Sequence, residues 1–298
     1  RYTNQHEGIV RSSNLCTEIT LHTKSSTYKN GEKTSIGETA VCNLGSVNLK
    51  NHIHTLHNKD TGEETSSIHW TRLGETIAVA IRMLDNVIDL NFYPTPEAQN
   101  SNLRHRPIGL GLMGLHDVLH VLNIDIDSPE SIIFNDKLFE FYSHAAIGAS
   151  SSLAQERGAY ESFIGSLWDQ GVLPLDSWNH LMEYRGNKKS HKTHFDWKAT
   201  RASIKEFGMR NSNVMAIAPT ATIGYINGVE QSIEPNFSVL FVYENKSGNF
   251  YITNEHFVKD MKSLDLWSHE TAAIVKSVDG DLSLLNGEIP HWIKDKYK

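Results

Sequence analysis

The chain of 298 residues has a formal net charge of −7, 39% hydrophobic and 21% charged residues, and two cysteines. This composition is typical of a globular protein with one or two domains, and it weighs against a broad nucleic-acid-binding face. The sequence has no apolar run near the ~20 residues that cross a membrane, and two cysteines without a signal peptide favour a reducing, cytoplasmic compartment.

The first cysteine lies in a short motif near the start of the chain. This motif reads Ser12-Ser13-Asn14-Leu15-Cys16-Thr17-Glu18-Ile19. If the segment is extended, side chains at alternate positions share one face, so Asn14, Cys16 and Glu18 bring together a hydrogen-bonding group, a thiol and a base. The alternative is a small buried thiol between solvated neighbours, because free cysteine is among the most buried residue types.

The second cysteine follows an exposed segment. Residues 24–37 are polar and contain glycine, which indicates a loop or turn. Residues 40–49 are mostly small and apolar, and they favour a buried strand or close-packed turn that carries Cys42 inward. Three histidines follow within the polar stretch 52–57. A metal site there is the alternative to ordinary solvated loop histidines.

The clearest helix is predicted over 71–90, because apolar residues recur there at three- and four-residue spacing. The residues on its predicted buried face are Leu73, Ile77, Ile81, Leu84 and Ile88. Pro94 and Pro96 are expected to end this helix. The segment 106–112 then alternates glycine with branched apolar residues, as does a buried strand that other backbone approaches closely.

Two histidines, His116 and His120, share one face of the next predicted helix, as in the His-Glu-x-x-His motif of zinc peptidases. Asp117 stands where that motif has glutamate, and its shorter carboxylate would reach a bound water poorly. A zinc hydrolase built on these histidines is therefore an alternative to an ordinary amphipathic helix.

Two later predicted helices have residues that are typical of helix ends. A helix over 128–156 begins at the N-cap Ser128, and a helix over 197–207 is closed by Gly208. The last predicted elements are a hairpin over 238–253 and a helix over 255–264.

A buried strand over 213–218 leads into a turn. The turn reads Pro219-Thr220-Ala221-Thr222-Ile223. Such a turn offers backbone N–H groups and hydroxyls to an anion, with an ordinary turn as the alternative. Strands at 8–10, 40–47, 106–112 and 213–218, separated by helices, indicate an α/β fold with a parallel sheet.

These motifs resemble the catalytic large (alpha) subunit of class I ribonucleotide reductase. The first is Asn-Leu-Cys-x-Glu-Ile at 14–19, followed by Cys42 in an Asn-Leu context. Three later stretches agree in order: Arg106-Pro107-Ile108-Gly109-Leu110-Gly111-Leu112, Ala218-Pro219-Thr220-Ala221-Thr222-Ile223 and Gln231-Ser232-Ile233-Glu234-Pro235. The region 229–250 resembles class I enzymes more than the cobalamin-dependent class. The resemblance covers essentially the whole chain.

The resemblance implies that residues 1–298 form a single portion of the catalytic domain. That portion is expected to be the C-terminal half of a ten-stranded α/β barrel with a central cysteine-bearing finger loop. The chain starts at Arg1 without a methionine, and its last residues, up to Lys298, are typical of the opening of a helix. We therefore expect a fragment or a split-gene piece of a longer subunit.

The resemblance also implies roles in the reduction of ribonucleotides, where a thiyl radical removes the 3′-hydrogen of the sugar. Cys16 is the expected thiyl, Glu18 the base at the 3′-hydroxyl, and Asn14 the group that holds the sugar hydroxyls. Cys42 matches one member of the redox-active dithiol that supplies electrons, and its partner in the family lies upstream. The residues expected to bind the substrate are Ser12, Ser13, Pro219, Thr220, Ala221, Thr222 and Ile223.

The expected substrate is a ribonucleoside diphosphate, and the activity belongs to deoxyribonucleotide biosynthesis for DNA replication. The expected partners are a radical-generating, metal-containing small subunit, the remaining N- and C-terminal parts of the large subunit, and thioredoxin or glutaredoxin, without nucleic acid or membrane. No metal or cofactor is expected on this segment, and allosteric nucleotides (ATP and deoxynucleoside triphosphates) are expected to bind outside it. A non-catalytic half that needs an N-terminal partner is the alternative, although the intact Asn14, Cys16, Glu18 and Cys42 argue against degeneration.

Overall fold

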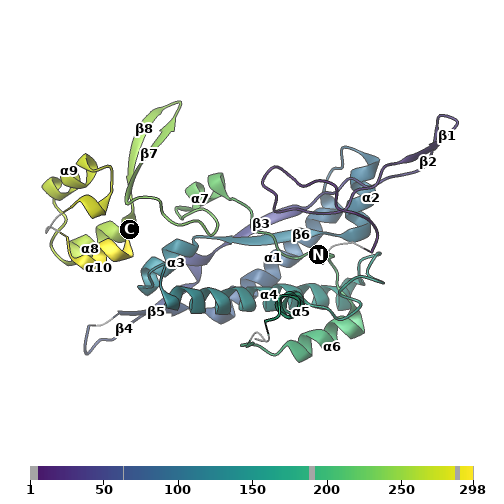
Figure 1. The fold of residues 1–298 in the computed structure, drawn as a ribbon, viewed down its shortest axis with the longest axis horizontal. Helices are drawn as coiled ribbons and strands as arrows, with labels where there is room; N and C mark the ends of the chain where they lie inside the picture. The colour runs from purple at the N-terminus through teal and green to yellow at the C-terminus, as the bar shows by residue number, and fades with distance from the viewer. Residues whose placement is uncertain (1–5, 63, 188–191, 286–288, 298) are drawn as a thin grey trace. The chain divides into compact units, whose positions relative to one another are not determined.

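The computed structural model describes residues 6–62, 64–187, 192–285 and 289–297 (Figure 1). The chain ends, Arg1 and Lys298, lie outside these ranges. The first compact unit comprises Arg1–Val47, His69–Leu112 and Asp136–Thr220, and the second unit comprises Asn48–Ile68, Met113–Asn135 and Ala221–Lys298. In the described ranges, none of the helices combines the length and the apolar character that crossing a membrane requires.

The first unit is built around strand β6 (Ile108–Met113), which is buried along its whole length. It pairs with β3 (Asn43–Asn48). It also hydrogen-bonds to the segment 213–216, with a parallel bridge between Leu110 and Met215. A strand with backbone partners on both edges and apolar packing on both faces reads as a continuous apolar run, which explains its sequence.

The strand predictions had different outcomes. Those at 106–112 and 40–47 are confirmed as β6 and β3, with ends displaced by a few residues. The segment 213–218 contributes a single bridge instead of a full strand. The prediction at 8–10 is wrong, because that segment pairs with no strand among the described residues, and a short apolar run without a partner forms none.

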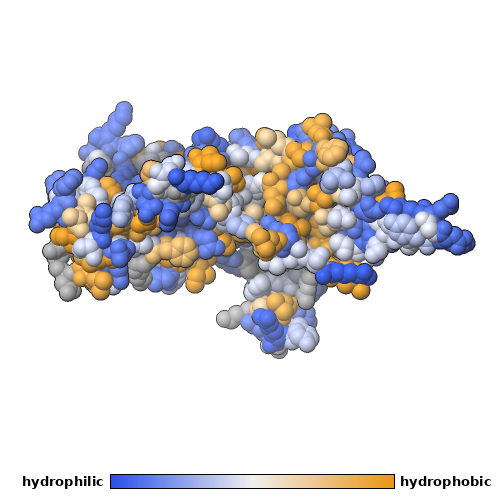
Figure 2. All heavy atoms as spheres, turned by 90° about the horizontal axis from the view of Figure 1, so that it is seen from above, coloured by the Kyte–Doolittle hydropathy of each residue, from blue (hydrophilic) through white to orange (hydrophobic). Residues whose placement is uncertain are grey.

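The polar segment 24–37 is a β-hairpin and not a loop, with β1 (Thr27–Lys29) antiparallel to β2 (Glu32–Ser35). Asn30 and Gly31 join the strands with positive φ angles of 52° and 85°, the conformation that a two-residue hairpin turn needs. The predicted exposure is confirmed, and Figure 2 shows hydrophilic residues covering this projecting hairpin at the right-hand end.

The helices of the first unit are α1 (Trp70–Leu90), α2 (Pro96–His105), most of α4 (Pro129–Arg157), α5 (Pro174–Tyr184) and α6 (Trp197–Phe207). The helices predicted over 71–90, 128–156 and 197–207 are therefore confirmed. The sequence-based interpretation took Pro96 as a stop, but Pro96 opens α2. Thr95 caps this helix by accepting a hydrogen bond from Ala98 N at 3.2 Å.

The buried face of α1 follows the apolar pattern, with one exception. Leu73, Ile77, Ile81 and Ile88 are fully buried, as predicted. At the remaining turn the structure buries Asp85 completely and leaves Leu84 only half-buried. At the start of α1, Trp70 packs edge-on against Phe141 of α4, with ring centroids 5.0 Å apart.

The close approach of β6 to its neighbour requires glycine at position 111. A Cβ atom at Gly111 would lie 2.4 Å from the backbone oxygen of Ala216, well inside van der Waals contact. The sequence prediction that other backbone approaches this strand closely is therefore confirmed.

We expect Gly111→Ala to lower the free energy of unfolding by roughly 1–3 kcal/mol, since a backbone oxygen inside the sheet cannot move aside freely. The matched control is Gly148→Ala in α4, where an added Cβ would meet nothing within 4 Å. This control should be neutral or stabilise by about 0.5–1 kcal/mol, because alanine favours helix. Urea denaturation of both variants measures the difference, and equal effects would contradict the packing argument.

The second unit combines two hairpins with short helices. Its elements are η1 (Leu49–His52), β4 (Ile53–His57), β5 (Glu64–Ile68), α3 (Leu115–Leu122), α7 (Ala221–Asn227), β7 (Leu240–Asn245), β8 (Gly248–Thr253), α8 (Glu255–Ser263), α9 (His269–Ser277), η2 (Leu282–Leu284) and α10 (His291–Lys296). Strands β4 and β5 pair antiparallel. Strands β7 and β8 also pair antiparallel, and this pair confirms the hairpin predicted at 238–253. The helix predicted over 255–264 is confirmed as α8. An apolar core that includes Phe257, Met261 and Ile293 holds the C-terminal helices together.

The assigned strands form four two-stranded sheets within the described ranges, and these strands do not close into a barrel there. The mixed α/β class is confirmed. The ten strands and the central finger loop stay predictions that rest on the family resemblance.

Candidate functional site

A pocket of about 320 Å³ in the first unit joins the two cysteine-bearing segments. Its lining residues are Ser12, Ser13, Asn14, Ile19, Leu21, Thr23, Thr39, Ala40, Cys42 and Leu44. Four residues that the sequence singled out, Ser12, Ser13, Asn14 and Cys42, thus lie around one cavity. The pocket thus brings together residues from two separate stretches, 12–23 and 39–44.

The loop that carries Cys16 is a tight turn and not the extended segment that the sequence analysis assumed. Thr17 N donates to Asn14 O at 3.2 Å, and Thr17 has a φ of 63°. The side-chain Oδ1 of Asn14 accepts a hydrogen bond from Ile19 N at 3.1 Å. Asparagine closes local turns in this way, so the alternation of side chains along a strand does not apply.

The turn gives the three central residues of the motif different environments. Cys16 is exposed at the turn. Glu18 is half-buried, and its Oε2 is buried without a hydrogen-bond partner. Burial, and secondarily the negative charge of Glu18, raises the pKa of the Cys42 thiol to about 12. The carboxylate of Glu18 therefore acts electrostatically on Cys42, a relation that spacing along the chain did not indicate.

Cys42 is held against the central strand. A Cβ atom at Gly109 of β6 would lie 3.3 Å from Cys42 Sγ and 2.6 Å from a methyl carbon of Leu44. The glycine at position 109 therefore leaves the space that the thiol fills. Both cysteines are free thiols in this structure.

We expect the two thiols to differ in their reaction with iodoacetamide at pH 8. With a pKa of about 12, Cys42 has a thiolate fraction about a thousandfold below that of an ordinary thiol of pKa ~8.5. Its labelling rate should rise about tenfold per pH unit up to pH ~11, because only the thiolate reacts. Mass spectrometry of timed samples should find Cys16 modified first, with both cysteines labelled alike in urea. Equal rates in the folded chain would contradict the raised pKa of Cys42.

The segment predicted to bind phosphate forms the start of a helix. Thr220 has a left-handed φ of 52°, and α7 begins directly after it at Ala221. Pro219 and residues 221–223 are exposed. Backbone N–H groups in the first turn of a helix have no hydrogen-bond acceptor within that helix, so they can donate to a group outside it. The role in substrate binding stays a prediction.

The α3 helix forms as predicted, but it is not an ordinary amphipathic helix with a solvated polar face, because both histidines and Asp117 are buried along with its apolar residues. The rings of His116 and His120 are tilted by 34°, with centroids 4.0 Å apart. Burial lowers the pKa of His116 to about 4 and that of His120 to about 2. His116 Nδ1 accepts a hydrogen bond from Asn236 N at 2.8 Å. Asp117 accepts one from Glu230 N at 2.7 Å, so neither Asp117 nor His116 is arranged as in a zinc peptidase.

Two groups of three side chains have the composition and the proximity of metal ligands in the described part of the chain. They are His22, Glu38 and His105 in the first unit, and Asp117, Glu255 and His256 in the second unit. The histidines at 52–57 and the pair on α3 belong to neither group. Sequence reasoning missed both groups because their members come from separate segments, and spacing along the chain carries no signal for them.

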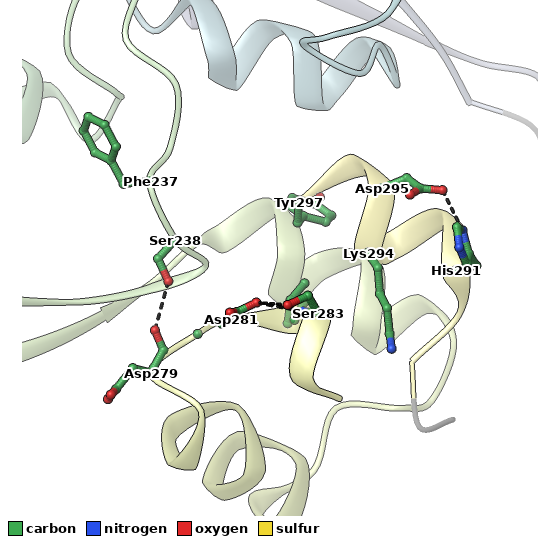
Figure 3. A pocket seen from close by; sticks show the side chains of 11 residues that line it. Phe237, Ser238, Asp279, Asp281, Ser283, His291, Lys294, Asp295 and Tyr297 are labelled. Atoms are coloured by element: carbon green, nitrogen blue, oxygen red, sulfur yellow. Dashed lines mark hydrogen bonds and ion pairs between the residues drawn. The ribbon is translucent and has the colours of Figure 1, made fainter. Parts of the chain in front are cut away.

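A larger pocket of about 600 Å³ lies in the second unit near α10 (Figure 3). Its polar groups pair among themselves: His291 Nδ1 lies 2.7 Å from Asp295 Oδ2, and Ser238 Oγ donates to Asp279 O at 3.2 Å. None of the residues singled out from the sequence lines it. Its size alone therefore does not make it the candidate site.

Comparison with known proteins agrees with the motifs. The family model described as "Ribonucleotide reductase, barrel domain" matches residues 1–298. The chain is 49% identical to the ribonucleoside-diphosphate reductase subunit alpha of Chlamydia pneumoniae over 99% of this chain and 26% of that relative. It is 36% identical to the large chain from Schizosaccharomyces pombe, over 100% of this chain and 33% of that relative. It is 34% identical to the large subunit from Danio rerio, over 99% of this chain and 33% of that relative. The chain thus spans about a quarter to a third of the length of these relatives.

Proposed function

Because this chain belongs to the ribonucleotide reductase barrel-domain family, we propose that it is one portion of the catalytic barrel of a class I ribonucleoside-diphosphate reductase. The observation that carries the proposal is the pocket that gathers Ser12, Ser13 and Asn14 beside Cys42. The pocket is lined both by a group that can orient a sugar, Asn14, and by a thiol that can supply electrons, Cys42. The exposed turn with Cys16 adjoins it in the chain.

Cys16 would begin the reaction as a thiyl radical that removes the 3′-hydrogen atom of the ribose. The S–H and C–H bonds are close in strength, so this transfer is reversible. Glu18 would accept the proton of the 3′-hydroxyl while the 2′-hydroxyl takes up a proton from the dithiol and leaves as water. Asn14 would hold the sugar hydroxyls in the reacting orientation. The exposure of Cys16 supports this role, since a thiyl must be reached both by substrate and by the source of the radical.

Cys42 would supply electrons for the second half of the reaction. Two thiols form a disulfide and release two hydrogens, of which one is added at the 2′ carbon and the other leaves with the 2′-oxygen as water. Cys16 then returns its hydrogen atom to the 3′ carbon and becomes a thiyl radical again. The second thiol of the pair would come from another part of the large subunit. Thioredoxin or glutaredoxin would reduce the disulfide again.

The diphosphate of the substrate would lie on the segment 219–223. The support is the resemblance of this segment to the family motif, together with its exposure and the change of backbone direction at Thr220. A metal-containing small subunit would supply the radical, and allosteric nucleotides would bind outside this chain. The ten-stranded barrel with its finger loop would be completed by the remaining parts of the large subunit.

The test is reduction of cytidine diphosphate by this chain alone and by the chain combined with its missing flanking segments and the small subunit. We expect no product from the chain alone, because it spans only 26% to 33% of the length of these relatives. The completed assembly should form deoxycytidine diphosphate. Product from the isolated chain would refute the need for the other segments, and a completed assembly that binds nucleotide without turnover would favour a non-catalytic half.

A further inference from the structure

A buried polar cluster in the first unit has no role in the proposed reaction. It consists of His22, Glu38 and His105, which are exposed by only 2%, 4% and 1%. The three residues come from separate places: His22 follows the cysteine-bearing turn, Glu38 precedes β3, and His105 is the last residue of α2. Burying three ionisable groups is costly unless each is paired or coordinates a metal.

The two imidazoles converge on a single carboxylate oxygen. His22 Nε2 lies 2.5 Å from Glu38 Oε2, and His105 Nε2 lies 2.9 Å from the same atom. One ligand atom from each residue lies within 4.8 Å of the other two. Two histidine nitrogens and one carboxylate oxygen form the donor set of many three-ligand zinc sites.

His22 provides an independent sign that the cluster is incomplete as it stands. Both of its ring nitrogens are buried, and neither makes a hydrogen bond of acceptable geometry, despite the short contact to Glu38. A buried polar group without a partner costs about 1–3 kcal/mol. A metal ion at Nε2 would give one of these nitrogens the partner that it lacks.

The other atoms of the cluster are held from outside, as the ligands of metal sites usually are. His105 Nδ1 lies 2.5 Å from Ser162 Oγ, which fixes the orientation of the ring. Glu38 Oε1 accepts a hydrogen bond from Arg104 NH1 at 2.8 Å, which leaves Oε2 directed at the imidazoles.

The local charge also favours a cation. Arg104 pairs with Glu38, Glu7 and Glu161, so one guanidinium faces three carboxylates and negative charge is left over.

We propose that His22, Glu38 and His105 bind a Zn²⁺ ion, with water as the fourth ligand, and that this ion fastens the two cysteine-bearing segments to helix α2. Zn–N bonds of ~2.0–2.1 Å in tetrahedral geometry place ligand atoms about 3.3 Å apart, so the two imidazoles withdraw from Oε2 by less than about 1 Å on binding. The chain leads directly from Glu18 to His22 and from Glu38 to Cys42. The ion would thereby limit the movement of both cysteines, a role beyond the proposed reaction and a resident metal that the sequence did not predict.

The test uses the 298-residue chain, stripped of metal with a chelator and then titrated with Zn²⁺ alone. Elemental analysis after dialysis should find one zinc per chain, and Zn²⁺ should raise the melting temperature. His22→Gln should lose this zinc and the thermal shift. Ser162→Ala keeps all three ligands and should bind zinc ~10–100-fold more weakly, because the ring of His105 is no longer oriented. Co²⁺ should give the visible absorption of a tetrahedral site in the parent chain and not in His22→Gln.

Two control variants separate this site from other zinc-binding groups. His256→Gln removes a member of the other three-residue group, and Cys16→Ser combined with Cys42→Ser removes both thiols. Both controls should retain full zinc binding. The proposal is overturned if the parent chain binds no stoichiometric zinc, if either control loses it, or if Ser162→Ala binds zinc as tightly as the parent. In each of these cases the cluster is a hydrogen-bonded network only.

Discussion

Replacing Cys16 by serine should abolish deoxyribonucleotide formation by the completed reductase. A serine O–H bond is much stronger than an S–H bond, so an oxygen-centred radical would not form from the same radical source. The other thiol of the chain, Cys42, is half-buried beside β6, away from the exposed turn that carries Cys16. The expected loss is to the background of the assay, at least a thousandfold, as for other residues on which a covalent step depends.

The same preparation provides the controls for the Cys16 variant. Cys16 is exposed at a turn, so its replacement should change the free energy of unfolding by no more than about 0.5 kcal/mol. Cys42→Ser should also stop turnover, yet still permit exchange of hydrogen at the 3′ carbon, because it acts after that step. Turnover by Cys16→Ser above background, or loss of 3′ exchange in Cys42→Ser alone, would reverse the two assignments.

Replacing Asp85 by alanine should lower the free energy of unfolding by about 3–5 kcal/mol, because it leaves buried positive charge uncompensated. Asp85 is fully buried on α1. Its Oδ1 accepts hydrogen bonds from Arg106 Nε and Asn211 Nδ2, both at 3.0 Å. Its Oδ2 faces Arg157 at 3.1 Å and Arg210 at 3.3 Å. Arg106 is itself only 5% exposed, so water cannot replace the lost carboxylate.

The matched control is Asp89→Ala, one turn further along α1. Asp89 also pairs with Arg106, at 2.7 Å, but its side chain is 49% exposed. Solvent screening limits such pairs to ~0–1 kcal/mol, and Arg106 would keep Asp85 as its partner. Urea denaturation at pH 7 compares the two variants. Similar losses for both would show that burial does not decide the strength of this network.

Helix α1 shows which structural features the spacing of apolar residues can predict. Apolar spacing identified its length and four of its buried residues, because a helix must bury one face. The same spacing predicted that Leu84 is buried, whereas the structure buries Asp85 and leaves Leu84 half-buried. A carboxylate becomes a core residue only when arginines from other segments surround it, and no local pattern contains that information.

The candidate site shows the same limit. Its motif residues were found because particular chemical groups stand in a characteristic order, and the pocket does bring Asn14 and Cys42 together. The shared face expected for Asn14, Cys16 and Glu18 required an extended segment, whereas the side chain of Asn14 bonds to the backbone and the chain turns there.

The sequence by itself determined the family, the main helices and the central strand of this chain, because periodicity and motif order are properties of local stretches. Only the tertiary structure decided that the charge of Glu18 contributes to the raised pKa of Cys42. It also decided that His22 and His105 both contact the same carboxylate oxygen of Glu38. Electrostatic interactions and ligand geometry depend on distances in space. Those distances are set by which segments pack together, and not by their separation along the chain.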